Sequence, residues 1–207
     1  KSDELGKAEV GQLSITLNNS NALYSPANSS GNLYGKLLPK RPIKVYHSAE
    51  GTTRPLFYGF LEEIIPHPHF AEQDCIITAV DGLDYLSRQE LDTILYKDQL
   101  TGTLVGNILD AAGWSSSARK IDAGQDTVPY GYWKDVKARF ALGEIEDSEL
   151  GFIYINCSGD LTYEDRHHRY TATHQTSQAT FNNTMLNITY SMNPSRIYNI
   201  ARATVTP

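Results

Sequence analysis

The stretch Leu13-Ser-Ile-Thr-Leu17 decides the fold class, because large aliphatic side chains alternate in it with small polar ones. Successive side chains of a β-strand point to opposite faces of the sheet, so this alternation predicts a strand with one buried face. Asn18 and Asn19 end the strand. Residues 18–35, which are rich in Asn and Ser and contain Pro26, predict a long ordered loop with little room for a helix.

Three more strands are expected before residue 81. The stiff turn 39–42 leads into an apolar run at 43–46, and further runs follow at 56–65 and 75–80. Short connections between consecutive strands predict an antiparallel sheet or small barrel, with a bulge at Gly59. Its core is expected to contain the following residues: Leu13, Ile15, Leu17, Val45, Phe57, Ile76 and Val80.

The pattern becomes helical after Asp81, where a short helical turn is expected at 81–86. A longer helix is predicted with Thr101 as its N-cap and Gly113 as its terminator, and another runs from Asp135 to Gly151. A hairpin is expected over 152–163. The inward faces of the two longer helices are predicted to be Leu104, Val105, Ile108, Leu109 and Ala112, and then Val136, Phe140, Ile145 and Leu150.

Strand alternation returns from Phe181, with Leu186, Ile188 and Tyr190 on one face. The fold class is therefore mainly β with an α/β insertion (α+β). We expect a first barrel-like domain over 1–84, a small α/β domain over 85–177, and the first strands of a second related barrel over 178–207. The missing initiator Met and the abrupt end at Pro207 predict that the chain is a piece of a longer protein.

Composition excludes some functions. The formal charge of −6 argues against a general nucleic-acid binder, because phosphate contacts need a basic face. No run approaches the ~20 apolar residues of a membrane span. Cys75 and Cys157 each lie in an apolar run, which favours two buried free thiols over one disulfide.

Two histidine pairs are candidate sites. His67 and His69 could offer two imidazoles to a metal ion, but the flanking prolines favour a stiff polar loop. His167 and His168, between Arg166 and Arg169, form a basic cluster that could contact a phosphate or an acidic partner. The acidic residues just before this cluster favour a solvated hairpin end instead.

Carboxylates and aromatic residues supply the remaining candidates. Glu62 and Glu63 are adjacent on a strand and should point to opposite faces, and the cluster 146–149 is expected on the solvated side of its helix. The aromatic residues form either an exposed platform for sugars or partners, or, as we favour, a plug over the α/β core. They are Tyr130, Tyr132 and Trp133.

We find no phosphate loop, dinucleotide fingerprint, nucleophile elbow or metalloprotease motif. The sequence therefore predicts that the protein is not an enzyme. It also predicts no cofactor and no metal ion, and we assign no catalytic residue.

One ordered series of motifs spans nearly the whole chain. It consists of Leu13-Ser-Ile-Thr-Leu-Asn-Asn-Ser20, Tyr24-Ser-Pro26, Tyr34-Gly-Lys-Leu-Leu-Pro-Lys-Arg-Pro42, Leu56-Phe-Tyr-Gly-Phe60, the run from Cys75 to Asp81 that leads into Gly-Leu, Ser148-Glu-Leu-Gly-Phe152 and Ser158-Gly-Asp-Leu-Thr-Tyr163. This series resembles the tail hub (baseplate hub, or tail-tip) proteins of tailed bacteriophages and prophages. Lys40 stands where that family usually has Gly.

The resemblance implies a barrel-like domain, an α/β insertion and a second barrel. It also implies a ring, commonly a trimer with pseudo-sixfold symmetry, that joins the tail tube to the tip without catalytic residues. The partners would be tail tube, tape-measure and distal tail or receptor-binding proteins. The location would be the virion, after assembly in the host cytoplasm.

The alternative is a tail-tip module that binds or degrades cell-wall glycans, drawing on Tyr130, Tyr132 and Trp133. For a ring, we expect the loop 18–35 to lie near a neighbouring subunit, and Leu186, Ile188 and Tyr190 to be buried in the assembly.

Overall fold

A computed structural model describes residues 7–68, 73–177 and 180. The chain divides into two compact units, Lys1–Tyr170 and Thr171–Pro207, and α4 (Ala172–Gln175) is the described helix of the second. The strands predicted after Phe181, including Leu186, Ile188 and Tyr190, lie outside the described residues.

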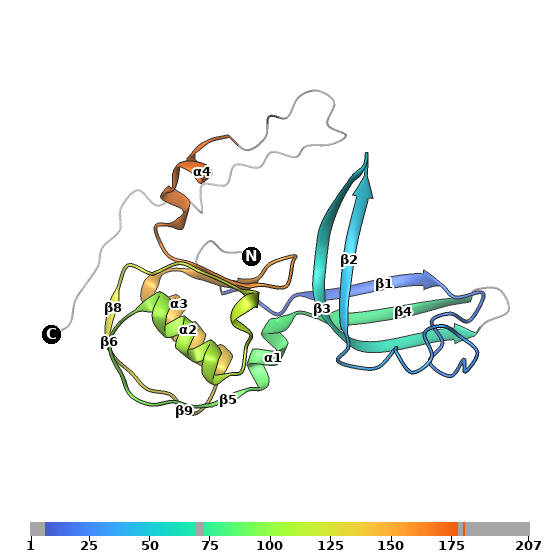
Figure 1. The fold of residues 1–207 in the computed structure, drawn as a ribbon, viewed down its shortest axis with the longest axis horizontal. Helices are drawn as coiled ribbons and strands as arrows, with labels where there is room; N and C mark the ends of the chain where they lie inside the picture. Colours follow the sequence, from blue (N-terminus) through green and yellow to red (C-terminus); the bar gives the residue numbers. More distant parts are fainter. Residues whose placement is uncertain (1–6, 69–72, 178–179, 181–207) are drawn as a thin grey trace, which may run out of the picture. The chain divides into compact units, whose positions relative to one another are not determined.

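The first unit begins with a four-stranded antiparallel sheet, which confirms the predicted strands (Figure 1). Its strands lie in the order β1-β4-β3-β2. Their bounds are β1 (Gln12–Asn18), β2 (Pro42–Ala49), β3 (Thr52–Pro68) and β4 (Gln73–Val80).

Strand β3 belongs to both halves of this sheet. Its residues 52–60 pair with β2 and its residues 60–68 pair with β4, so the two neighbours overlap only at Phe60. The sheet is therefore a curled half-barrel, and in Figure 1 β2 and the first half of β3 stand apart from β1 and β4. A strand that changes neighbours at a bulge is a common way to turn a sheet corner.

Strand β3 has register shifts at Leu56 and Glu62, not at Gly59 as expected. Its pairing with β2 skips from Pro55 to Phe57, and its pairing with β4 skips from Leu61 to Glu63. Gly59 has a different role. A Cβ at this position would lie 2.3 Å from the carbonyl oxygen of Val80 and 2.6 Å from the Phe57 ring. Gly59 therefore permits the close backbone approach at the corner.

The loop after β1 is ordered and contains no helix, as predicted. From Ala22 to Tyr34, every third residue donates its backbone N–H to the carbonyl three residues earlier. Asn19 is buried at the start of this series of turns. Its Oδ1 accepts a hydrogen bond from the Tyr24 N–H at 2.8 Å, and its Nδ2 donates to Ser25 Oγ at 3.0 Å.

The core of the sheet is smaller than expected. Its buried cluster consists of Leu61, Cys75 and Ile77, with partly buried neighbours that include Ile15 and Leu17. Of the residues expected in this core, only Val80 is buried, and the others are half-buried. Ile76 was placed on the wrong face, since Cys75 and Ile77 are the β4 residues that point into the cluster.

The rest of the first unit is an α/β region. Its helices are α1 (Gly82–Arg88), α2 (Thr101–Ala111) and α3 (Ala138–Glu149), with a 3₁₀ turn, η1 (Ser116–Ala118), after α2 and another, η2 (His168–Tyr170), at the end. Its short strands are β5 (Glu90–Asp92), β6 (Tyr96–Leu100), β7 (Arg119–Ile121), β8 (Thr127–Gly131) and β9 (Lys134–Lys137). The predicted hairpin is β10 (Phe152–Ile155) and β11 (Leu161–Glu164), and β7 lies parallel to β11.

Helix α2 has the predicted inward face, from Leu104 to Ala112, and Gly113 follows its end with a φ of +73°. Its start differs from the prediction. Leu100 is the N-cap and Thr101 is the first helical residue. The Thr101 hydroxyl does not cap the helix, because it donates to Glu149 instead.

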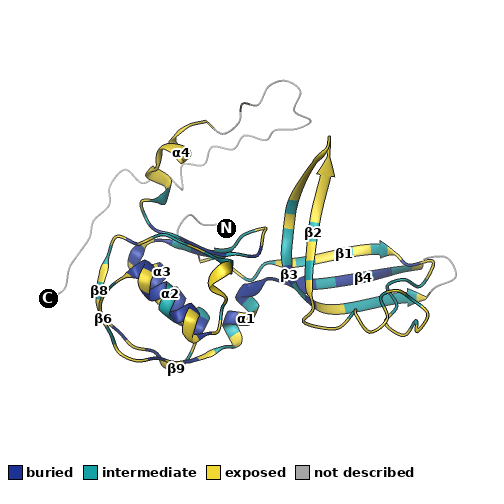
Figure 2. Ribbon diagram, in the orientation of Figure 1, coloured by how far each residue is buried: buried dark blue, intermediate teal, exposed yellow. Residues whose placement is uncertain are grey.

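Helix α3 was predicted with the wrong phase. It begins at Ala138, because residues 134–137 form β9, and its inward face carries Ala141, Leu142 and Ile145. Phe140 and Leu150 are exposed, although both were expected inside. Together the helices and hairpin enclose a cluster of sixteen buried residues, and Figure 2 shows the buried faces of α2 and α3.

Candidate functional site

Asp81 joins the sheet to the α/β region. Its Oδ2 accepts the Gly11 N–H at 2.8 Å, and its Oδ1 accepts the Leu83 N–H at 2.9 Å as the N-cap of α1. Burial raises the pKa of this carboxyl, and the two hydrogen bonds partly oppose that rise. The Asp-Gly pair at the end of a predicted strand was the sequence signal for this cap.

The carboxylate cluster at the end of α3 is not solvated as expected. Glu149 is fully buried, and its Oε2 accepts from Thr101 Oγ1 at 2.7 Å and from the Asp126 N–H at 3.1 Å. The Gln125 N–H lies 3.2 Å from both oxygens, and Arg166 Nε lies 3.6 Å from Oε1. Glu149 thus ties α3 to the start of α2 and to the loop before β8.

Glu146 is also buried, whereas Asp147 and Ser148 are exposed. Glu146 Oε1 accepts the Ile153 N–H at 3.1 Å, and Oε2 lies 3.4 Å from the Arg139 guanidinium. The solvated interpretation was therefore wrong for Glu146 and Glu149. Their helical spacing puts both on the inward face, where backbone donors from other elements satisfy them.

The basic cluster after β11 is solvated only in part: His167 and Arg169 are exposed, whereas Arg166 and His168 are half-buried and paired. Arg166 binds Asp126 through two hydrogen bonds of 3.1 and 2.5 Å, and this carboxylate raises the pKa of the guanidinium. His168 Nδ1 lies 2.6 Å from Asp122 Oδ2. Arg169 lies 4.3 Å over the ring of Phe152. The cluster fastens the end of the first unit to the loop 122–126.

Of the first histidine pair, His67 lies in β3 and His69 lies outside the described residues. His67 Nδ1 is 2.7 Å from Asp74 Oδ1 on β4. The search for ligands close to His67 in sequence missed Asp74, because this carboxylate lies on the facing strand. Among residues 7–68 and 73–177, no group of three His, Cys, Asp or Glu side chains could hold a metal ion.

The aromatic residues are divided between two environments. Trp133 is buried in the α/β core and its Nε1 donates to Glu144 Oε2 at 2.8 Å, as the plug interpretation required. Tyr130 and Tyr132 are 69% and 56% exposed. The exposure of these two rings agrees with the interpretation as an exposed platform.

The two cysteines are free, as predicted, but only Cys75 is buried. Burial raises the pKa of its thiol. Cys157 is exposed in the turn between β10 and β11, because this turn ends the apolar run that suggested burial. It borders a small cavity of about 140 Å³ that is also lined by Gly11, Leu56, Phe57, Tyr58, Asp81, Ile155 and Asn156.

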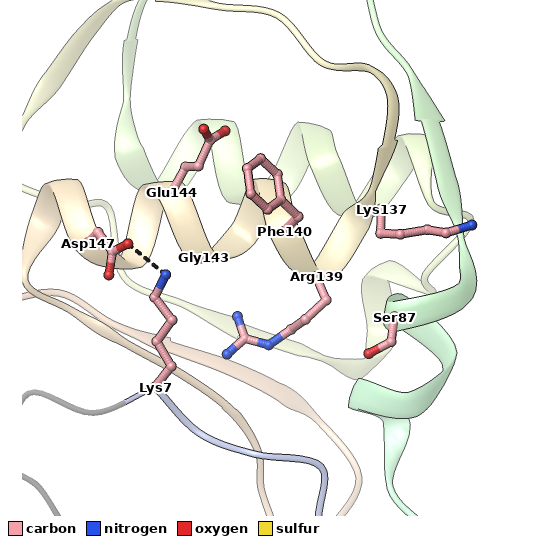
Figure 3. Close-up of a pocket in the computed structure, with 8 residues that line it drawn as sticks. All are labelled: Lys7, Ser87, Lys137, Arg139, Phe140, Gly143, Glu144 and Asp147. Atoms are coloured by element: carbon pink, nitrogen blue, oxygen red, sulfur yellow. Dashed lines mark hydrogen bonds and ion pairs between the residues drawn. The ribbon is translucent and has the colours of Figure 1, made fainter.

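A larger cavity of about 610 Å³ lies beside α3 (Figure 3). It is lined by Lys7, Ser87, Lys137, Arg139, Phe140, Gly143, Glu144 and Asp147. Each of its three cations has a carboxylate partner: Lys7 pairs with Asp147 at 2.6 Å, Lys137 with Glu90 at 2.6 Å, and Arg139 with Glu146. Glu144, the remaining charged residue of the lining, accepts a hydrogen bond from Trp133 Nε1.

The open sheet contributes backbone groups to the surface. In the described part of the chain, β1 and β2 are the edge strands and each has a strand neighbour on one side only. Within that same part, no helix has the length and apolarity of a membrane span.

No family model and no curated protein matches the chain. Among solved structures, it is similar to a 43 kDa tail protein of prophage MuSo2 from Shewanella oneidensis, with 12% identity and a TM-score of 0.47, over 77% of this chain and 45% of that one. It is also similar to a tail protein from Neisseria meningitidis MC58, with 11% identity and a TM-score of 0.46, over 58% and 38% of the two chains. The chain thus spans less than half of either protein.

Proposed function

We propose that this chain is a structural protein of a bacteriophage tail, and that it is a hub protomer in the baseplate or tail tip. The observation that carries the proposal is the ordered motif series from Leu13 to Tyr163. Its members fall on β1, the loop after it, the turn before β2, the corner of β3, β4, the end of α3 and the hairpin β10–β11.

Two motif positions have a physical requirement that supports the resemblance. Lys40, where the family usually has Gly, has a φ of +65°, a conformation that glycine adopts without strain. Gly59, in the Leu56-to-Phe60 motif, lies where a side chain would collide with Val80 and Phe57. The motifs therefore match backbone geometry and not only composition.

The Tyr24-Ser-Pro26 motif has a partner in the strand before it. Asn19 accepts the Tyr24 N–H and donates to Ser25, so the motif is fixed to the end of β1.

The proposed assembly is a ring, with a trimer as the expected form, that joins the tail tube to distal tip or fibre proteins. The half-barrel supports this proposal, since open sheet edges in a stable protein are usually paired or covered. A head-to-tail contact that closes on itself would cover such edges without forming a filament. The tape-measure and receptor-binding proteins are the further partners we propose, and the virion is the proposed location.

The test is electron microscopy of purified virions labelled with an antibody to this chain. We expect label at the junction between tail tube and tip, and a ring-sized oligomer of the purified protein by light scattering. Virions that lack the chain would overturn the proposal.

A second candidate function is binding of cell-wall glycans, which the exposure of Tyr130 and Tyr132 favours. Titration with peptidoglycan oligosaccharides, followed by tyrosine and tryptophan fluorescence, tests it. Saturable binding that Tyr132→Ala abolishes would support this function, and an unchanged spectrum would exclude it for these ligands.

A further inference from the structure

The β2–β3 arm, which we define as residues 42–58, extends from the corner of the sheet. Its two strands pair with each other, while residues 52–59 of β3 have no pairing with β4. Near its middle, Tyr46 and Leu56 are 53% and 59% exposed. An isolated two-stranded hairpin is marginally stable in water. The arm therefore gains from a surface that covers these side chains.

The arm and its base are basic in an acidic protein. Residues 36–60 contain five Lys or Arg and a single acidic residue, whereas residues 81–170 contain sixteen acidic and nine basic residues. Lys40 pairs with Asp84 at 3.2 Å. Arg41, Lys44 and Arg54 are exposed and form no ion pair with residues 7–68 or 73–177.

The tyrosine patch, which we define as Ile94, Leu95, Tyr130 and Tyr132, is the matching apolar surface. Its residues lie on two segments that run side by side, joined by the pairs β5–β9 and β6–β8 and by the Thr93 N–H bond to the Trp133 carbonyl. Ile94 is 74% exposed and Leu95 is 49% exposed, so the patch presents four large exposed side chains with the two tyrosines.

Acidic side chains flank the tyrosine patch. Asp92, Asp98 and Asp135 are exposed and form no ion pair within the described ranges. The cations of the same segments are Lys134 and Lys97, and Lys97 Nζ already lies 5.9 Å over the Tyr130 ring. The tyrosine patch therefore consists of exposed apolar side chains with unpaired carboxylates beside them.

We infer that the β2–β3 arm of one protomer docks on the tyrosine patch of a second copy of this chain. This inference rests on the proposed ring and names the surfaces that form it. Tyr46, Leu56, Tyr130 and Tyr132 are each more than half exposed, so the arm does not cover the patch of its own chain. The apolar side chains would meet in the centre, and the arm's cations would face the aspartates at the rim.

The two surfaces are different, so the contact is heterologous. Each protomer offers an arm to one neighbour and a patch to the other, and such a contact forms a ring when its rotation closes. Complementary charge favours this pairing over arm against arm, where like charges would meet.

Cysteine cross-linking between two variants of the full chain tests the inference. In a Cys157→Ser background, one chain carries Leu56→Cys and the other carries Tyr132→Cys, and the two are mixed and oxidised. We expect a covalent dimer with one chain of each kind in the mixture. A matched control replaces Tyr132→Cys by Leu150→Cys, whose site is 60% exposed on the end of α3 and should not cross-link.

Light scattering of the same samples separates the possible failures. Oligomers without the mixed cross-link, or oligomers that cross-link Leu56→Cys to itself, would overturn the inference and leave the ring in place. A chain that stays monomeric at every concentration would contradict the ring as well.

Discussion

The half-barrel sheet and the α/β region differ in how they bury apolar residues. The α/β region encloses a cluster of sixteen buried residues between helices and hairpin, while the buried cluster of the sheet contains three. Figure 2 shows the contrast between the buried helix faces and the exposed β2. Burying one large aliphatic side chain contributes about 1.5–3 kcal/mol, so the two regions differ greatly in hydrophobic stabilisation. We propose on this basis that the sheet, unlike the α/β region, needs a neighbouring chain to cover it.

The largest effect is expected from Glu149→Ala, which removes the acceptor shared by Thr101, the backbone of 125–126 and Arg166. Losing one partner of a buried charged network costs about 3–5 kcal/mol. Both tryptophans lie in the α/β region, so urea unfolding followed by tryptophan fluorescence measures this loss. Asp147→Ala, which breaks an exposed ion pair with Lys7, is the control and should cost less than about 1 kcal/mol. Equal effects of the two variants would contradict the buried network.

The next effect is on the sheet. Gly59→Ala places a methyl group 2.3 Å from the Val80 carbonyl and should destabilise the corner by about 1–3 kcal/mol. Because the cores are separate, we expect faster hydrogen exchange in β3 and β4 with little change in α2. Gly106→Ala, in a helix with open space around it, is the matched control and should stabilise by up to about 1 kcal/mol. Faster exchange throughout α2 in Gly59→Ala would show that the two regions unfold as one.

Substitution of Lys40 tests the turn before β2. The left-handed backbone at Lys40 costs about 1 kcal/mol, and Lys40→Gly removes this strain. The variant also loses the exposed ion pair with Asp84, which contributes less than about 1 kcal/mol. A small rise in the thermal midpoint is therefore expected. Lys40→Val keeps the strain, adds β-branching and should lower the midpoint. If Lys40→Val is the more stable variant, the conformation at Lys40 is not strained.

The smallest effect concerns acid stability at the junction. Burial raises the pKa of Asp84, but hydrogen bonds from Arg88 and Lys40 outweigh it, so the folded pKa lies below the ordinary value. This contribution is present at neutral pH and is lost as the pH falls through the folded pKa. Asp84→Asn should therefore lower the thermal midpoint near pH 7 and have no effect at the lowest pH. A difference that persists unchanged into acid would contradict this assignment.

The local pattern of apolar and polar residues was enough to predict the four strands of the sheet and the inward face of α2. In β1 the strict alternation of Leu13, Ile15 and Leu17 left little choice, and Gly113 marked a helix end. The curled sheet was harder to predict, since the half-burial of Val45 and Phe57 depends on which elements cover them. Alternation specifies faces but does not say how completely a face is covered.

The predictions that were wrong concern side chains whose hydrogen-bond partners are distant in sequence. Glu146 and Glu149 were predicted to be solvated because carboxylates usually are, and the donors that satisfy them come from β10, α2 and the loop before β8. The inward face of α3 was predicted wrongly because the residues of β9 were taken as the first turn of the helix. That error placed Phe140 on the inward face. The short strands β5 to β9 have too few residues to show a period.

The most direct test of whether the sheet needs a neighbouring chain is residue-resolved hydrogen exchange on the full chain at low and high protein concentration. We predict that amides of α2 and α3 are protected equally at both concentrations. Amides of β2 and of residues 52–58 should become protected only at the high concentration, where the chain associates. Equal protection of β2 in a proven monomer would contradict the account, because the sheet would then need no neighbour.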